Sequence, residues 1–182
     1  GHTLGSDINF PWDIMVASTE AEARQAFRDS TSIGQNFVTI DRQGNFGWYP
    51  YNFVPSRPWT TVYPAYVPIP GDGRFEWQGG IPEGQLPQAR NPGRGFIATA
   101  NADMTGQLYD GIPVNDGRPY IQSGVDPGYR QERIAQVLNG TITHTLATMQ
   151  ALQNDIVSLP GRHTTPVMLR AVASASGELT AE

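Results

Sequence analysis

The side chains that could act as nucleophiles do not form a recognisable catalytic set in this sequence. The chain has no Lys and no Cys, and all 12 basic residues are Arg. A lysine nucleophile, a Schiff base, a thiol nucleophile, a disulfide and a thiolate metal site are therefore excluded within the chain. The serine motifs G-x-S-x-G and S-x-x-K are also absent. The residues alone thus predict no self-sufficient catalytic machinery.

The histidines and the acids do not show the spacing of a metal site. His2, His144 and His163 are far apart, and none belongs to an H-x-x-x-H or H-E-x-x-H motif. Most aspartates stand beside Gly, Pro or Asn, which is typical of turn formers. These aspartates are Asp13, Asp29, Asp41, Asp72, Asp103, Asp110, Asp116 and Asp126. A calcium site built from loop carboxylates and carbonyls remains an alternative, although no EF-hand spacing supports it.

The composition favours a loop-rich chain of one-domain length. The 182 residues include 20 Gly and 15 Pro, and only 16% are charged. The net charge of −5 and the absence of a basic run argue against nucleic-acid binding. No apolar run approaches the roughly 18 residues of a membrane span, and we expect no signal peptide within this sequence.

The first fifty residues predict one helix and one β-hairpin. Residues 1–17 are expected to be irregular and apolar, and a helix capped by Ser18 is expected to follow to about Asp29. Residues 36–41 and 46–49 read as two strands, and the turn between them contains a glycine. This is the clearest hairpin signal in the sequence.

The middle of the chain predicts loops with a single short strand. Prolines recur through residues 50–95 and forbid a long helix, so a packed, meandering layer with interleaved aromatics is expected. Residues 95–100 read as an apolar strand that ends at Asn101. A second loop-rich region then extends to about Gly128.

The last third predicts helices. The first is expected over 129–138, and the second from a cap at Thr143 or Thr145 to about Ser158, where Pro160 ends it. The second carries apolar residues at helical spacing, which predicts a core-facing stripe. Its members are Leu146, Met149, Leu152, Ile156 and Leu159.

A third helix could begin at Pro166 and continue to about Val172. The predicted fold class is therefore α+β, with long Pro/Gly-rich loops, a β-hairpin and two or three late helices. We expect a single domain over 1–173 and a flexible tail over 174–182.

Four stretches, in matching order, resemble the penicillin acylase family of N-terminal-nucleophile amidohydrolases. Residues 36–48, with 55–57 behind them, are similar to the motif N-F-x-x-x-D-x-x-G-N-I-G and its downstream P-x-R. Residues 68–82 resemble P-x-P-G…W-x-W-x-G-x-x-P, and residues 91–101 resemble N-P-x-x-G-[YF]-I-x-x-x-N. Residues 129–158 resemble an R-x-x-R-I helix followed by a Q-x-D-x-x-S helix, although here the second reads Q-N-D-I-V-S.

The resemblance implies a fold and a reaction. The fold would be part of an αββα sandwich, in which two sheets lie between helical layers. The reaction would be amide hydrolysis by an N-terminal Ser whose own α-amino group acts as the base. A backbone N–H and an Asn side-chain amide would hold the oxyanion of the tetrahedral intermediate.

Two residues take site roles by this resemblance. Asn101 falls where the family has its oxyanion-hole Asn; the alternative is a turn-forming Asn that closes a strand. Arg130 falls where the family has an active-site Arg that helps to position this Asn; the alternative is a surface residue of an amphipathic helix. Arg57 matches the P-x-R position, for which a structural role is expected.

The resemblance implies no cofactor for the chemistry and a possible structural calcium. One calcium-ligand region of the family lies between the positions that match Asn101 and Arg130. Asp116 is the nearest acid, but the local match is loose and predicts no ligand set.

Two departures limit what the chain is expected to do. The nucleophilic Ser should begin the family's β chain, yet residue 1 is Gly, and Ser6 follows a glycine inside the chain. Ala102 stands where the family has Asn or Asp, and Asp103 comes one residue later. We therefore expect a piece of the β chain that lacks the nucleophile and is inactive alone.

The resemblance also implies partners and a location. The partners would be the α chain, the N-terminal part of the β chain and a small N-acyl substrate, and the location would be periplasmic or secreted. A non-catalytic binding or scaffold domain derived from this fold is the alternative function. An unrelated carbohydrate-binding β domain is a third reading, which the late helices do not favour.

Overall fold

The computed structural model describes residues 7–31, 34–50, 53–106, 108, 117, 119–122, 124–141 and 143–175. Its contacts group the chain into two compact units. Unit 1 consists of Gly1–Thr99 and Asp103–Val125, and unit 2 of Ala100–Ala102 and Asp126–Glu182. The single domain expected over 1–173 stays a prediction, and most of the expected tail lies outside the described residues.

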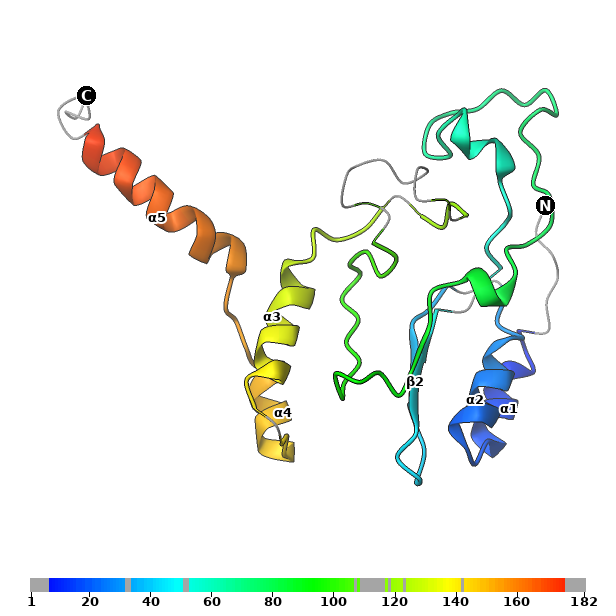
Figure 1. Ribbon diagram of the computed structural model, residues 1–182, viewed down its shortest axis with the longest axis horizontal. Helices are drawn as coiled ribbons and strands as arrows, with labels where there is room; N and C mark the ends of the chain where they lie inside the picture. The colour runs from blue at the N-terminus through cyan, green and yellow to red at the C-terminus, as the bar shows by residue number, and fades with distance from the viewer. Residues whose placement is uncertain are drawn as a thin grey trace. The chain divides into compact units, whose positions relative to one another are not determined.

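Unit 1 begins with two helices that contact each other, α1 (Phe10–Val16) and α2 (Glu20–Phe27) (Figure 1). The irregular structure expected over 1–17 is wrong for Phe10–Val16, where a proline in the first turn of α1 fits a helix start, and residues 1–6 lie outside the described residues. The expected cap of α2 is wrong by one residue. Thr19 caps the helix, and its side chain accepts a hydrogen bond from the backbone N–H of Glu22, 3.2 Å away. The carboxylate of Glu22 accepts in return from the backbone N–H of Thr19 at 3.1 Å, which completes a capping box.

The sheet of unit 1 confirms the predicted hairpin. Strands β1 (Phe37–Ile40) and β2 (Phe46–Tyr49) pair antiparallel, with Asp41 accepting from the backbone of Asn45 at 2.8 Å inside the turn. A third strand that the sequence did not indicate, β3 (Ala89–Arg90), pairs with β2 on its other side. Two residues carry too little periodicity to be recognised as a strand.

Helix α2 packs on this sheet and forms the core of unit 1. Ala23, Phe27 and Tyr49 are buried together, and the ring of Phe37 stacks on that of Phe27 with centroids 4.1 Å apart. Such stacking adds to the free energy gained by burying apolar surface. The core therefore holds α2 against the hairpin.

The buried side chain of Glu20 lies in this contact. Its carboxylate accepts a hydrogen bond from the hydroxyl of Tyr49 and forms an ion pair with Arg90 at 2.7 Å. Burial and the neighbouring carboxylate raise the pKa of the Tyr49 hydroxyl, so it stays protonated and donates. A carboxylate with both a donor and a cation can be buried at tolerable cost.

The proline-rich region forms loops, as predicted. Among its described residues, helical structure is limited to two short 3-10 turns, η1 (Pro58–Thr61) and η2 (Glu83–Gln85). The strand expected over 95–100 is wrong, because the described residues of that segment pair with no neighbouring strand. Instead, the carbonyl of Phe96 accepts from Arg94 Nε at 2.9 Å.

The described residues of unit 2 form three helices, α3 (Tyr129–Asn139), α4 (Leu146–Gln153) and α5 (Leu159–Ser174) (Figure 1). Helix α3 confirms the prediction, and Thr145 caps α4 through a hydrogen bond from the backbone N–H of Thr148 at 3.3 Å. The helix expected to continue to Ser158 ends five residues earlier.

Helix α5 differs most from the prediction. Pro160 was expected to end a helix, but it lies in the first turn of α5, where its missing N–H costs nothing. Ser158 caps this helix by accepting from Gly161 N at 3.1 Å. Pro166 lies inside α5, so the expected third helix is longer than predicted at both ends.

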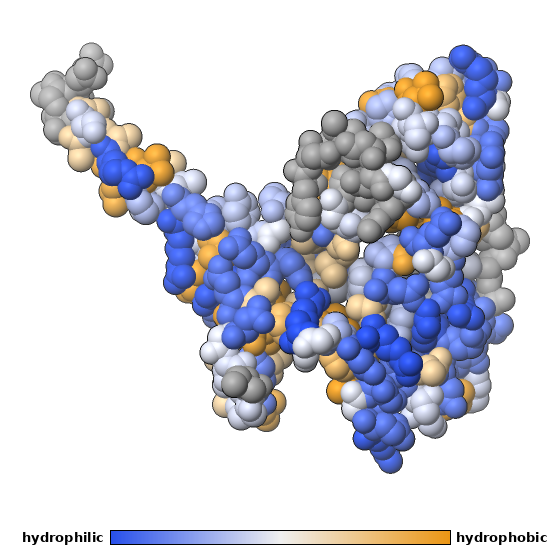
Figure 2. Space-filling view, in the orientation of Figure 1, coloured by the Kyte–Doolittle hydropathy of each residue, from blue (hydrophilic) through white to orange (hydrophobic). Residues whose placement is uncertain are grey.

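The apolar stripe predicted across residues 146–159 does not form one buried face. Leu159 is 3% exposed, but Leu146 is 77% exposed and Ile156, which lies between α4 and α5, is 95% exposed. Figure 2 likewise shows apolar side chains on the visible surface of α5. The helices of unit 2 thus present apolar side chains that nothing in the described chain covers.

Candidate active site

Asn101 adopts a backbone conformation that most side chains avoid. Its φ angle is +59°, in the left-handed region, where Asn is tolerated better than most residues. Its carbonyl accepts a hydrogen bond from the backbone N–H of Asp126 at 2.7 Å, and Ala102 pairs with Asp126 in a parallel bridge. The segment that carries Asn101 is therefore fixed to unit 2 by backbone bonds.

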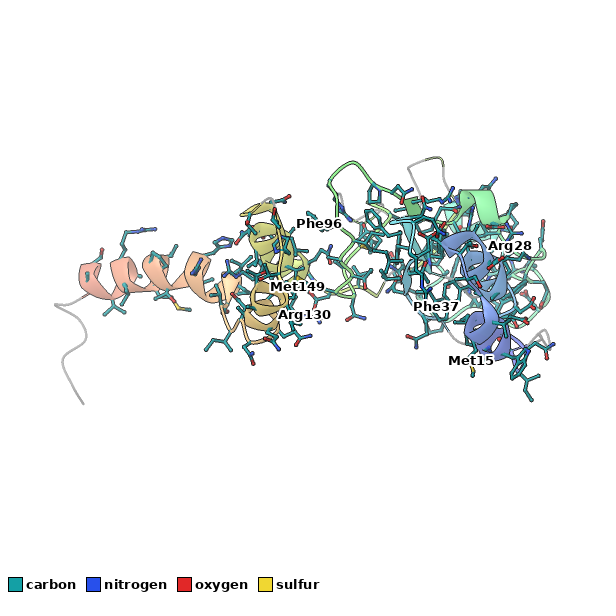
Figure 3. The ribbon with its side chains drawn as sticks, turned by 90° about the horizontal axis from the view of Figure 1, so that it is seen from below. Met15, Arg28, Phe37, Phe96, Arg130 and Met149 are labelled. Carbon is teal, nitrogen blue, oxygen red and sulfur yellow. The ribbon has the colours of Figure 1, made fainter. Side chains whose placement is uncertain are left out.

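Arg130, in the first turn of α3, contacts this segment directly (Figure 3 labels its position). Its Nη2 donates to the side-chain Oδ1 of Asn101 and to the carbonyl of Ala100, each at 3.0 Å. The structure thus brings together the two residues that the sequence proposed for the site.

This contact determines how the Asn101 amide is oriented. A guanidinium only donates hydrogen bonds, so the side-chain atom that faces Arg130 must be the amide oxygen. The Nδ2 group then points the other way, and within the described part of the chain it donates to no acceptor. The exposed Asn101 therefore presents two N–H donors for which the described residues provide no partner.

Asp126 joins the two residues, and the sequence analysis missed it. Its Oδ2 accepts from Nη2 of Arg130 at 3.0 Å and from Nε at 3.3 Å, and its Oδ1 accepts from the backbone N–H of Gly128 at 3.1 Å. The hydrogen bonds from Arg130 and Gly128 hold the pKa of this carboxyl below its usual value. The available signal was an Asp four residues before an Arg at a helix start, where the two side chains can meet.

The described serines of unit 2 do not provide a nucleophile that could act beside Asn101. Ser158 caps α5 as described above, and the hydroxyl of Ser174 donates to the carbonyl of Arg170 at 3.0 Å. The arrangement can therefore orient and donate hydrogen bonds to a developing negative charge, but a reacting group would have to come from elsewhere.

The described residues contain no cluster of three metal-ligating side chains. Asp116, the acid considered for calcium, lies outside the described residues. The carboxylate of Asp103 is occupied by hydrogen bonds from Thr105, Gly106 and Leu108 at 2.6–3.1 Å. Burial would raise the pKa of Asp103, but these hydrogen bonds outweigh that effect and lower it. Asp103 thus organises its own loop in unit 1.

Arg57 belongs to unit 1 and makes a different kind of contact. Its guanidinium lies 5.7 Å from the ring centre of Trp77 and 5.9 Å from that of Tyr120. Burial lowers the pKa of Arg57, and cation–π contacts offset part of the cost of removing the charge from water. The expected structural role of Arg57 stays a prediction.

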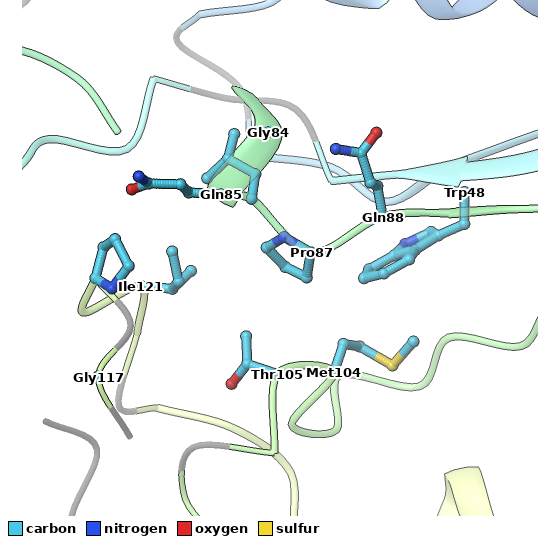
Figure 4. Close-up of a pocket in the computed structure, with 11 residues that line it drawn as sticks. Trp48, Gly84, Gln85, Pro87, Gln88, Met104, Thr105, Gly117 and Ile121 are labelled. Atoms are coloured by element: carbon cyan, nitrogen blue, oxygen red, sulfur yellow. The ribbon is translucent and has the colours of Figure 1, made fainter. Parts of the chain in front are cut away.

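Unit 1 also contains an open cleft of about 530 Å³ (Figure 4). Trp48, Leu86, Pro87, Met104 and Ile121 line it with apolar surface, while Gln85 and Thr105 add polar groups. Its size suits a small molecule. None of the described residues that line it carries an ionisable side chain.

With this geometry described, comparison with known proteins places the chain in a family. The sequence pattern of the family described as penicillin amidase matches residues 6–181. The chain belongs to the penicillin amidase family.

Individual relatives share up to about a third of the aligned residues. Penicillin acylase 2 proenzyme of a Pseudomonas species (strain SE83) is 32% identical over 143 residues, which are 78% of this chain and 17% of that protein. The acyl-homoserine lactone acylase QuiP of Pseudomonas putida is 30% identical over 169 residues, or 86% of this chain and 19% of that protein. The chain thus spans less than a fifth of the length of these relatives.

A solved structure supports the fold. The thermostable penicillin G acylase from Alcaligenes faecalis superposes with a TM-score of 0.69 and 19% identity, covering 97% of this chain and 29% of that chain. The fold class α+β is consistent with this likeness and with the helices and small antiparallel sheet. No helix among the described residues is long and apolar enough to cross a membrane.

Proposed function

We propose that this chain is part of the β chain of an N-terminal-nucleophile acylase and supplies one half of its oxyanion hole. One observation carries the proposal. The Oδ1 atom of Asn101 is held by Arg130, so that the Nδ2 group is directed away with its hydrogens free to donate. The chain's membership in the penicillin amidase family supports an amide as the substrate bond.

The proposed reaction uses a Ser that we place outside this chain. That Ser, at the start of the β chain, transfers its hydroxyl proton to its own α-amino group and attacks the carbonyl carbon of the substrate amide. The carbonyl oxygen becomes an oxyanion, which accepts hydrogen bonds from the Nδ2 group of Asn101 and from a backbone N–H outside the chain.

The intermediate then collapses in the usual order for acyl transfer. The C–N bond breaks, the amine leaves with the proton from the α-amino group, and an acyl ester on Ser remains. Water attacks this ester while giving a proton to the α-amino group, and a second oxyanion forms at the same place. The C–O bond to Ser then breaks, the Ser oxygen takes the proton back, and the carboxylic acid is released. Asn101 therefore acts twice in each turnover, without gaining or losing a proton.

The proposed partners are the remaining acylase segments, namely an α chain and the N-terminal part of the β chain. The relatives support this proposal, because this chain spans 17% of the Pseudomonas penicillin acylase and 29% of the Alcaligenes chain. The proposed substrate is a small N-acyl compound such as a β-lactam with an acyl side chain or an acyl-homoserine lactone. The proposed location is periplasmic or secreted, and no cofactor is needed for the chemistry, although a structural calcium fits the proposal.

Hydrolysis assays test this proposal. We expect the full-length protein that contains this chain, once processed, to release carboxylic acid from penicillin G or from an acyl-homoserine lactone. A serine reagent should block this release, and the 182-residue chain alone should release none. Turnover by the isolated chain that a serine reagent blocks would contradict the proposal, and an inactive full-length protein would favour the binding or scaffold alternative.

A further inference from the structure

We propose that Asp126 is a positioning residue that holds Arg130, and through it the amide of Asn101, in the orientation that the oxyanion requires. This inference rests on the proposed function. Neither the resemblance nor the comparisons assign a role to Asp126. Six hydrogen bonds inside unit 2 support this role.

Arg130 needs a second anchor to act as a positioning group. Its side chain is long and 59% exposed, and ordering such a side chain costs conformational entropy. The two oxygens of the Asn101 segment contact only Nη2, so they leave the guanidinium free to rotate about that atom.

Asp126 supplies that anchor along one edge of the guanidinium. Its Oδ2 accepts from both Nε and Nη2, at 3.3 and 3.0 Å. With the Nε–Nη2 edge held, Nη2 is directed at the carbonyl of Ala100 and at Oδ1 of Asn101. The rotation that the Asn101 contacts alone allow is thereby restricted.

Asp126 is itself fixed to the Asn101 segment. Its backbone N–H donates to the carbonyl of Asn101 at 2.7 Å, while its Oδ1 accepts from the N–H of Gly128 at 3.1 Å. This second contact forms an Asx-type turn before α3, which the left-handed φ of +90° at Gly128 accommodates. One residue therefore ties the backbone of Asn101 to the side chain that orients its amide.

The chain offers a matched control for this contact. Arg133, also on α3, forms an ion pair with Asp155 at 2.6 Å and a second bond through Nε at 3.0 Å. This pair has the same chemistry in the same unit, but neither residue has a described contact with Asn101. Its loss should therefore lower stability without changing the orientation of the amide.

The test is a double-mutant cycle in the processed full-length protein. Asp126→Asn keeps the shape of the side chain and an oxygen for the turn but removes the charge. Arg130→Lys keeps the charge but removes the planar guanidinium with its paired donors. We expect Asp126→Asn to lower kcat by about tenfold or more with KM nearly unchanged, because misplacing a catalytic group costs rate. The double variant should be no slower than Arg130→Lys alone, because Asp126 acts through Arg130. Asp126→Glu should recover part of kcat, and Asp155→Asn should leave kcat unchanged.

The outcomes separate this inference from the function on which it rests. Additive losses in the double variant, equal losses for Asp126→Asn and Asp155→Asn, or an unchanged kcat for Asp126→Asn would each overturn the role of Asp126. If Asp126→Asn does not fold, kcat of Asp126→Glu is compared with kcat of Arg130→Lys. A higher kcat for Asp126→Glu supports the role of Asp126, and an equal or lower kcat overturns it. If replacing Asn101 leaves kcat unchanged, the proposed function itself is contradicted.

Discussion

At the residue scale, the proposed function gives one side-chain amide two distinct tasks. The oxygen of Asn101 accepts a hydrogen bond from Arg130, and the nitrogen is proposed as a neutral donor to an oxyanion. A neutral donor suits this task, because it stabilises the developing charge without itself titrating. The left-handed backbone at Asn101 is one reason for an Asn here, since most other side chains would be strained.

The ionisation of Asp126 predicts how this site responds to acid. The pKa of Asp126 is lowered in the folded state, so its contacts are complete above the ordinary value of 3.8 and are lost as the pH falls through the lower, folded value. We expect the Gly128 amide signal in NMR spectra to stay constant from neutral pH down to about pH 4 and to shift only below that.

The Val157 amide provides the control for this titration. The N–H of Val157 donates to Asp155, and the hydrogen bond from Arg133 lowers the pKa of Asp155. The Val157 signal should therefore also shift only at a pH below the ordinary pKa of an aspartate. A midpoint for Gly128 above 3.8 would show that Arg130 does not stabilise the Asp126 carboxylate.

At the element scale, the contact between α2 and the hairpin depends on a glycine in β2. A Cβ atom at Gly47 would lie 2.5 Å from Oε1 of Glu20 and 2.6 Å from the ring and hydroxyl of Tyr49. Both neighbours are buried and hydrogen-bonded, so neither can move without losing contacts.

We therefore expect Gly47→Ala to lower the free energy of unfolding by about 1–3 kcal/mol, as overpacking of a core does. Chemical denaturation followed by tryptophan fluorescence measures this loss. Gly84→Ala is the control, because an added Cβ there meets nothing within 4 Å, and it should be nearly neutral. Equal stability of the two variants would show that Glu20 and Tyr49 leave room for a Cβ atom at position 47.

The elements also show what the sequence could and could not predict. The hairpin over β1 and β2 and helix α3 were predicted, because alternation, a glycine turn and helical spacing are local signals. The boundary between α4 and α5 was not, because Pro160 can either end one helix or begin the next. The apolar spacing from Leu146 to Leu159 continued across that boundary and suggested one helix where there are two.

At the scale of the whole molecule, the site is assembled from segments far apart in the sequence. Asn101 and Arg130 were proposed from the family's motifs, and their contact could not be derived from spacing, because it depends on how a loop returns to the start of α3. Asp126 was missed for the same reason. The sequence indicated only a turn at Asp126, whereas the structure shows that its carboxylate binds both Gly128 and Arg130.

The exposed apolar side chains of unit 2 fit the proposal that further acylase segments cover this chain. Met168, Leu169 and Val172 on α5 are each more than half exposed. Exposed apolar side chains gathered on one element are typical of an interface.

The most direct test of the central claim is the turnover of the processed full-length protein carrying Asn101→Gly. Glycine adopts the left-handed backbone at this position freely, so the substitution removes the amide without strain. We predict that kcat for an N-acyl substrate falls by about 10²–10³-fold while KM changes little, as for loss of one oxyanion donor. A kcat equal to that of the unaltered protein would contradict the claim that Asn101 holds the oxyanion.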